Sequence, residues 1–174
     1  MPLTLALSPE YRGEGNNTVI TLRFIPAVIF HFSFFICNLL FAIMSLLEQM
    51  IEKFRQDRYA MLTGIEIVDV APGYAKTKLV IEEKHLNAVD IVQGGVVFTL
   101  ADFAFAVAGN SGDETVVSIE ANISYMKPSR VGNTLYAEAK EISRSKSLVS
   151  YDIPVTDEQG NLICRFYGRA FVRR

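Results

Sequence analysis

The sequence predicts one α+β domain over residues 44–174, in which a curled antiparallel β-sheet wraps around a single long apolar helix. Residues 91–111 carry one ionisable side chain, Asp102, and a helix that is apolar on every side has to be buried. Runs of alternating apolar and polar residues on both sides of this segment are typical of half-buried strands. A sheet that carries one such helix can bury it by curling around it.

Residues 1–43 form an N-terminal extension that differs in composition from the domain. Residues 1–23 are polar and turn-rich, whereas residues 24–47 contain no formally charged side chain and reach the length of a membrane span. Three interpretations stay open. The segment is a membrane anchor, with Lys53, Arg55 and Arg58 holding the domain on the cytoplasmic side; it is cleaved; or the start is misassigned and Met44 is the first residue.

The first elements of the domain follow Met44. Ser45 and Glu48 form a capping box, and the helix that they open carries its apolar residues on one side (Leu47, Met50, Ile51 and Phe54). Gly64 then leads into a strand over residues 65–70, and Pro72-Gly73 marks a turn. The second strand alternates, so one set of its side chains should face the core: Ala75, Thr77, Leu79 and Ile81.

The remaining elements are the buried helix and a run of strands. A polar loop at residues 85–87 precedes the helix, which we expect from about Gly95 to Gly109. Strands are predicted over residues 115–126, 134–142, 148–155 and 162–172, with a turn at 157–161. Long strands with free edges favour edge-to-edge pairing, so a dimer is expected.

Composition argues against several functions. With 17 Lys and Arg against 19 Asp and Glu, the chain lacks the basic excess of a general nucleic-acid binder. Cys37 and Cys164 lie far apart and show neither disulfide nor metal-ligand spacing, so a reduced cytoplasmic setting is expected. His31 and His85 are isolated, which argues against a histidine-based metal site.

Asp102 is the strongest chemical signal in the chain. A carboxylate is almost never fully buried without a partner, and within four residues only Thr99 offers a side-chain hydrogen bond. Asp102 therefore needs a distant partner, a neighbouring subunit or a chemical role. Gly94 and Gly95 open the same helix, and bare N–H groups at a helix start can hold an oxyanion.

The combined spacing of these residues resembles a known family. Asn87 is followed six residues later by Gln93-Gly94-Gly95, and then by Leu100-Ala101-Asp102 on the helix. This is similar to the hotdog-fold acyl-CoA thioesterases of the phenylacetate-degradation (PaaI-like) type, whose pattern has His-Gly-Gly at the second place. The resemblance extends over residues 60–174 and implies a hotdog fold, to which the helix predicted after Met44 adds an N-terminal helix.

The resemblance implies a role for each matching residue. Asp102 matches the acidic residue that acts as nucleophile or as general base toward water, and Gly94 matches the glycine whose N–H polarises the thioester carbonyl. Asn87 matches a residue that orients the substrate or the acid, and Ser118 a position where some members hold the attacking water. Structural interpretations stay open beside these: a hydrogen-bonded buried Asp, a tight glycine turn, an Asx-turn and a tolerated strand Ser.

Gln93 departs from the family pattern, because it stands where the family has His. A Gln amide can donate a hydrogen bond to a thioester oxygen but cannot transfer a proton. The replacement excludes any mechanism that needs an imidazole at this position, and it bears on rate and substrate more than on fold.

The resemblance also implies a substrate site built for coenzyme A. Substrate contacts are expected at Gly95 and at basic residues that meet the nucleotide end, although each is equally explained as solvated surface: Lys127, Arg130, Arg144 and Lys146. Three phenylalanines either line an acyl pocket or belong to the core: Phe98, Phe103 and Phe105. The resemblance implies no metal or redox cofactor. It places Asp102 of one subunit opposite Gly94 and Asn87 of another in a homodimer, and whether two such dimers pair into a homotetramer stays open.

The expected function is hydrolysis of small, medium or aryl acyl-CoA thioesters in the cytoplasm. Two alternatives stay open: a non-catalytic acyl-CoA-binding protein, and a hotdog hydratase or dehydratase, for which the usual catalytic His is missing near Asp102. If residues 24–47 are an anchor, the domain is attached to a membrane and faces the cytoplasm.

Overall fold

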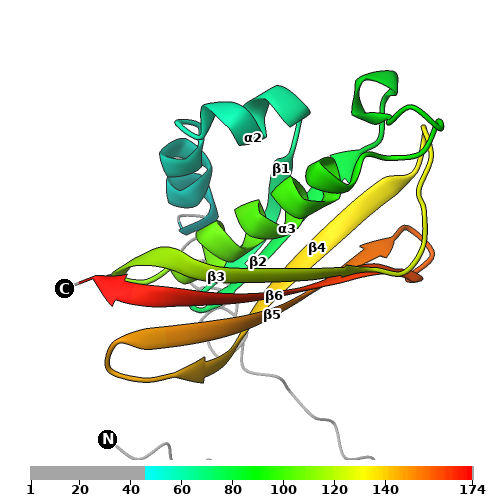
Figure 1. Ribbon diagram of the computed structural model, residues 1–174. Coiled ribbons are helices and arrows are strands. Elements are labelled where there is room, and N and C mark those ends of the chain that lie inside the picture. The colour runs from blue at the N-terminus through cyan, green and yellow to red at the C-terminus, as the bar shows by residue number, and fades with distance from the viewer. Residues whose placement is uncertain (1–45, 174) are drawn as a thin grey trace, which may run out of the picture. The chain divides into compact units, whose positions relative to one another are not determined.

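The computed structural model describes residues 46–173, which fold into helices on one side of a curved β-sheet (Figure 1). Residues 46–54 are helical. The elements that follow are α2 (Arg58–Thr63), β1 (Glu66–Ala71), β2 (Tyr74–Val80), the 3-10 turn η1 (Glu83–His85), α3 (Gly94–Gly109), β3 (Thr115–Tyr125), β4 (Thr134–Arg144), β5 (Leu148–Asp157) and β6 (Leu162–Arg173).

The six strands form one antiparallel sheet in the order β1-β2-β4-β5-β6-β3, which leaves β1 and β3 at its edges. The sheet curves around α3, and residues 46–54 with α2 lie on the opposite side of that helix (Figure 1). This architecture confirms the α+β prediction of a curled antiparallel sheet around one long helix.

Alternation decides which side chains of the strands reach α3. In β2, Ala75, Thr77 and Leu79 are at most 1% exposed, while Lys76 and Lys78 between them point outward. Lys76 pairs with Glu138 at 2.8 Å across the neighbouring strand. A strand with one apolar and one charged face can lie only at the boundary between core and solvent, as predicted.

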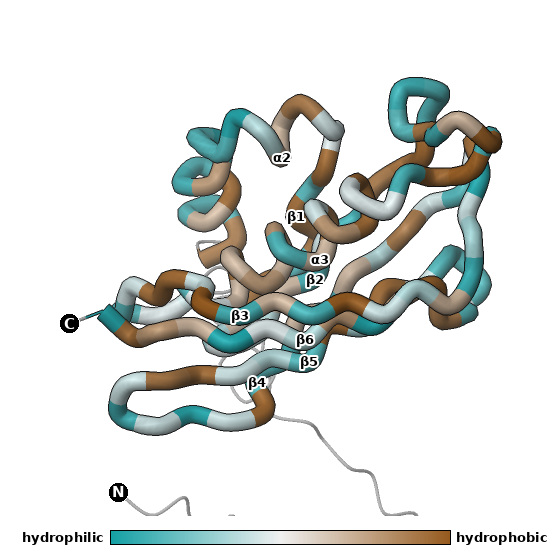
Figure 2. The backbone as a smooth tube through the Cα atoms, viewed as in Figure 1, coloured by the Kyte–Doolittle hydropathy of each residue, from teal (hydrophilic) through white to brown (hydrophobic). Residues whose placement is uncertain are grey.

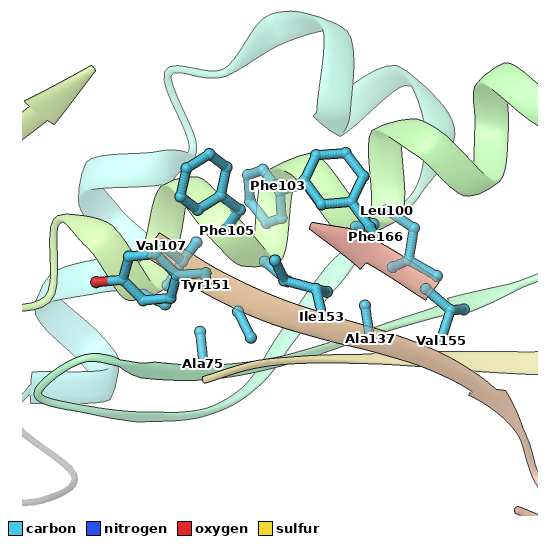
Figure 3. Close-up of a cluster of buried hydrophobic side chains, with 14 of the residues drawn as sticks. Ala75, Leu100, Phe103, Phe105, Val107, Ala137, Tyr151, Ile153, Val155 and Phe166 are labelled. Atoms are coloured by element: carbon cyan, nitrogen blue, oxygen red, sulfur yellow. The ribbon is translucent and has the colours of Figure 1, made fainter. Parts of the chain in front are cut away.

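The core lies between α3 and the concave face of the sheet. Leu100, Phe105 and Val107 of α3 face side chains of β5 and β6, among them Tyr151, Ile153, Val155 and Phe166 (Figure 3). The ring centroid of Phe105 lies 5.2 Å from that of Tyr151. A Cβ atom at Gly168 would lie 2.7 Å from the Phe105 ring, so this close approach requires glycine.

Two features differ from the sequence prediction. The short helix α2 was not expected: Asp57 caps it by accepting a hydrogen bond from the Ala60 N–H at 3.1 Å, and Gly64 ends it with φ 83°. In addition, α3 is not buried on every side, because Phe98, Thr99 and Asp102 stay partly exposed. Figure 2 shows α3 largely apolar or neutral, whereas the loops, the strands and residues 46–54 include many hydrophilic residues.

Part of the N-terminal predictions lies outside the described residues. The Ser45 cap and nearly all of the apolar stretch 24–47 precede residue 46, while the predicted helix that follows is present over residues 46–54. Met50 is buried there, and Leu47 and Phe54 pack against the core. Among residues 46–173, no helix combines the length and the apolar character needed to cross a bilayer.

Candidate active site

The N-terminus of α3 carries two backbone donors without an acceptor. Gln93 is the N-cap, and its Oε1 accepts a hydrogen bond from the Val96 N–H at 3.2 Å. The N–H groups of Gly94 and Gly95 lie in the first turn, where a helix offers no internal acceptor, and they donate to no other described residue. Together with the positive end of the helix dipole, they suit a developing oxyanion.

Tyr125 fixes the backbone at this position. Its Oη donates to the Gly94 carbonyl oxygen at 2.9 Å, and a Cβ atom at Gly94 would lie 3.2 Å from the ring. A tyrosine hydroxyl is protonated at neutral pH and can donate this bond, and burial raises the pKa of the Tyr125 hydroxyl further. The sequence prediction missed this residue.

Gly94 opens into a cavity of about 440 Å³, here called the Gly94 cavity. It brings together three residues predicted from the sequence: Asn87, Gly94 and Lys127. The other lining residues are mostly apolar: Ile91, Val92, Val97, Tyr125, Met126, Pro128 and Ile163. Lys127 and the free N–H of Gly94 make this cavity suitable for a ligand that carries both a carbonyl and an anionic part.

Asn87 has a structural role in the loop before α3. Its Oδ1 accepts from the Val89 N–H at 3.0 Å and from the Ile91 N–H at 3.4 Å, which is an Asx-turn. Its Nδ2 donates to no described residue, and Asn87 lines the Gly94 cavity. The structural and the functional interpretation therefore apply to different atoms of the same side chain.

His85 does not replace the missing family histidine. Its Nδ1 accepts from the Glu82 N–H at 2.9 Å, so the proton is on Nε2, which donates to the Thr63 carbonyl at 2.9 Å. The carbonyl of His85 accepts from the Gln93 N–H at 2.8 Å. This buried neutral imidazole ties the loop to the start of α3.

Asp102 lies in a second cavity of about 350 Å³, here called the Asp102 cavity. Its lining comes from α2, from the residue before it and from one face of α3: Asp57, Tyr59, Ala60, Gly95, Phe98, Thr99, Asp102, Phe103 and Ala106. The carboxylate makes no hydrogen bond or ion pair with any residue of 46–173, because the Thr99 hydroxyl donates to the Gly95 carbonyl instead, at 2.8 Å. Asp102 thus lacks the partner that a merely structural buried carboxylate would have.

The surroundings of Asp102 favour its protonated form. Burial raises the pKa of its carboxyl, and the negative charge of Asp57 raises it further. The described lining of the cavity contains no basic side chain to counter these effects. A carboxylate with a raised pKa is a stronger base once it is ionised.

Ser118 lies in neither cavity. It is exposed on the edge strand β3, where the pairing with β6 shifts register between Ser118 and Glu120. Val116 of the same strand lies beside Gly109, and Tyr125 lies beside Gly94, so β3 runs antiparallel along α3. Ser118 is therefore level with the C-terminal half of α3.

Of the four predicted basic residues, only Lys127 lines one of these two cavities. Arg130 is exposed in the loop before β4, and Lys146 in the turn between β4 and β5. Arg144 lies at the other end of α3, where it pairs with Glu114 and with Glu141, each at 2.7 Å. The carboxylates of Glu114 and Glu141 therefore balance the positive charge of Arg144.

Two of the three phenylalanines on α3 line the Asp102 cavity, Phe98 and Phe103, while Phe105 belongs to the core. No three His, Cys, Asp or Glu side chains within residues 46–173 are grouped as a metal site requires.

Comparison with known proteins shows that this chain is similar to thioesterases. Residues 90–164 match the family model of the thioesterase superfamily. The acyl-coenzyme A thioesterase PaaI of Escherichia coli is 31% identical over 117 residues, which cover 67% of this chain and 84% of that protein. A protein of Archaeoglobus fulgidus provisionally named an esterase is 35% identical over 71% of this chain and 84% of its own length. The structure of the E. coli PaaI protein superposes with a TM-score of 0.66 at 28% identity, over 74% of this chain and 96% of that one.

Proposed function

Because the chain belongs to the PaaI-like branch of the thioesterase superfamily and is a hotdog-fold thioester hydrolase, we propose that it hydrolyses acyl-CoA with small, medium-length or aromatic acyl groups. One observation carries the assignment of the site. The carboxylate of Asp102 has no described partner and a raised pKa, and it lies on the helix whose first two N–H groups are unpartnered. A base and an oxyanion donor are the two groups that acyl transfer requires.

In the proposed reaction, the thioester carbonyl oxygen accepts a hydrogen bond from the Gly94 N–H, which stabilises the negative charge that develops on it. Asp102 either attacks the carbonyl carbon, giving an anhydride that water then cleaves, or takes a proton from the attacking water. The C–S bond breaks, and the electron pair leaves with the CoA thiolate. Gln93 cannot transfer a proton, so in the second route Asp102 is the group that accepts the proton from the attacking water.

The separation of the two cavities supports a site shared between two chains. Asp102 shares its cavity with Gly95 but not with Gly94 or Asn87. We therefore propose that Asp102 of one chain acts on a thioester held at Gly94 and Asn87 of another. The free edge of β3 supports pairing, because several large apolar side chains are exposed along this strand: Val117, Ile119, Tyr125 and, just beyond it, Met126. Ser118 would then lie at the interface, and further pairing of dimers into a tetramer is part of the same proposal.

Coenzyme A is proposed to lie across the mouth of the Gly94 cavity, with its phosphates near Lys127. The Nε2 group of Gln93 is left to donate to the thioester oxygen, because Oε1 caps α3. Arg130 and Lys146 are candidates for the outer contacts of the nucleotide. We leave Arg144 out of the site, because two carboxylates already neutralise it.

The proposed function is tested by free-thiol release from a panel of acyl- and aryl-CoA esters, with wild type and Asp102→Asn compared. We expect turnover of at least one ester, reduced by about 10³-fold or more in the variant, and unchanged folding by circular dichroism. Binding of CoA esters without turnover in wild type would show a binding protein instead.

A further inference from the structure

We infer that Phe103 closes a tunnel that runs beneath α2 from the Asp102 cavity into a second, apolar cavity, and that its ring thereby sets the length of acyl chain that this protein accepts. The inference rests on the proposed function, because the chain that would enter the tunnel belongs to a thioester held near Asp102.

The second cavity, here called the rear cavity, has a volume of about 270 Å³. It is lined by the helix over residues 46–54, by α2, by the residues around the start of β1, and by α3: Ile51, Phe54, Arg55, Met61, Ile65, Glu66, Ile67 and Phe103. Six of these eight residues are apolar. A cavity of this composition suits a saturated hydrocarbon chain, which gains free energy from each methylene removed from water.

Phe103 lines both cavities. Its ring is only 2% exposed and packs edge-on against Phe54, with 5.6 Å between the ring centroids. Above it, consecutive residues of α2 face the two cavities: Ala60 lines the Asp102 cavity, and Met61 lines the rear cavity. The two cavities therefore lie on either side of α2, with the Phe103 ring between them.

The neighbouring aromatic residue on α3 provides a contrast. Phe105 is also 2% exposed, but it packs on Tyr151 and Phe166 of the sheet and lines none of these cavities. Truncating Phe103 should open a passage next to the reacting carboxylate, whereas truncating Phe105 should only loosen the core.

The experiment measures kcat/KM for saturated esters from acetyl-CoA to dodecanoyl-CoA in wild type, Phe103→Ala and the control Phe105→Leu. In wild type we expect kcat/KM to increase with the length of the acyl chain only up to a short chain. In Phe103→Ala it should rise about fourfold for each methylene that enters the rear cavity. The control should lose thermal stability but keep the wild-type profile. Phe103→Leu serves in place of the alanine variant where the latter does not fold.

A second substitution tests the route of the chain. Ile67→Trp fills the rear cavity, so it should cancel the gain of Phe103→Ala with long esters and leave the profile of wild type unchanged. An effect of Ile67→Trp alone on long esters would show that the tunnel is already open, and would overturn the role given to Phe103.

Binding separates this inference from the proposed function. The Kd of uncleavable S-alkyl-CoA thioethers should follow the same length profile in each variant, without any turnover. Thioether binding that follows the profile, with no thioester cleaved by wild type, would support the tunnel and refute the hydrolase. Identical length profiles in wild type and Phe103→Ala, or a wild-type optimum at decanoyl-CoA or longer, would overturn the inference.

Discussion

Gly94 and Asp102 lie eight residues apart on α3 and face different cavities. At a rise of 1.5 Å per residue, their backbones are about 12 Å apart along the helix axis. A single chain therefore does not bring the carboxylate to the free N–H of Gly94. Two copies related by a twofold axis can do so, since each would supply one half of each site.

The Gly94 N–H can be tested with a matched pair of substitutions. Gly94→Ala and Gly94→Pro both add a Cβ about 3.2 Å from the Tyr125 ring, but only proline removes the N–H. Proline is well tolerated at the first position of a helix. We expect kcat of Gly94→Pro to be about 10²–10³-fold below that of Gly94→Ala, the usual cost of an oxyanion donor. Equal kcat values in the two variants would remove Gly94 from the mechanism.

Asp57 should tune the pH dependence of the reaction. The reaction needs ionised Asp102, so kcat/KM should rise with pH through the raised pKa of that carboxyl. Asp57→Asn removes a negative charge that raises this pKa but keeps a residue able to cap α2. The acid limb of the kcat/KM profile should move to lower pH. The control Asp113→Asn, in the exposed loop before β3, should leave the acid limb in place. An acid limb that stays in place in both variants would contradict the assignment of Asp102 as the group whose ionisation the reaction requires.

The same raised pKa predicts a cost in stability. Between the usual Asp pKa of 3.8 and the raised value, the folded state binds more protons than the unfolded state. The free energy of unfolding contributed by Asp102 therefore falls as pH rises through this window. Asp102→Asn should unfold a few degrees above wild type at neutral pH, and the difference should vanish below the window. Calorimetry at both pH values checks this, and equal Tm values at neutral pH would argue for a hidden partner of Asp102.

Lys127 should contribute to recognition of the nucleotide part of the substrate. For a CoA ester, Lys127→Ala should raise KM about fivefold, as expected for one exposed ionic contact. The same acyl group on pantetheine, which lacks the nucleotide, should show no change. High salt should reduce the effect. Arg144→Gln, by contrast, should lower thermal stability through lost pairing with Glu114 and Glu141 and leave KM unchanged.

Local patterns in the sequence predicted most of the fold. The alternation through Ala75, Thr77 and Leu79 identified β2, because the period of a strand depends on adjacent residues alone. Asp102 was also found from adjacent residues alone, because it is the one ionisable group in an apolar helix. The helix α2 was missed, because six residues are too few to show a helical period, although Asp57 and Gly64 are its cap signals.

Local sequence patterns did not predict contacts between residues that lie far apart in the chain. Tyr125 meets Gly94 across 31 positions, and Arg144 meets Glu114 across 30. Neither pairing leaves a periodic trace in the sequence. For this reason Tyr125 was missed, and the ion pairs that Arg144 forms with Glu114 and Glu141 were not foreseen.

A complementation assay tests the shared site most directly. Asp102→Asn and Gly94→Pro, each expected to be inactive alone, are unfolded together in equal amounts, refolded and assayed for thiol release. In a shared site, each mixed dimer has one pocket with both changes and one with neither, so the mixture should regain about a quarter of wild-type activity. A mixture no more active than the two separate variants would contradict a site made of Asp102 from one chain and Gly94 from the other.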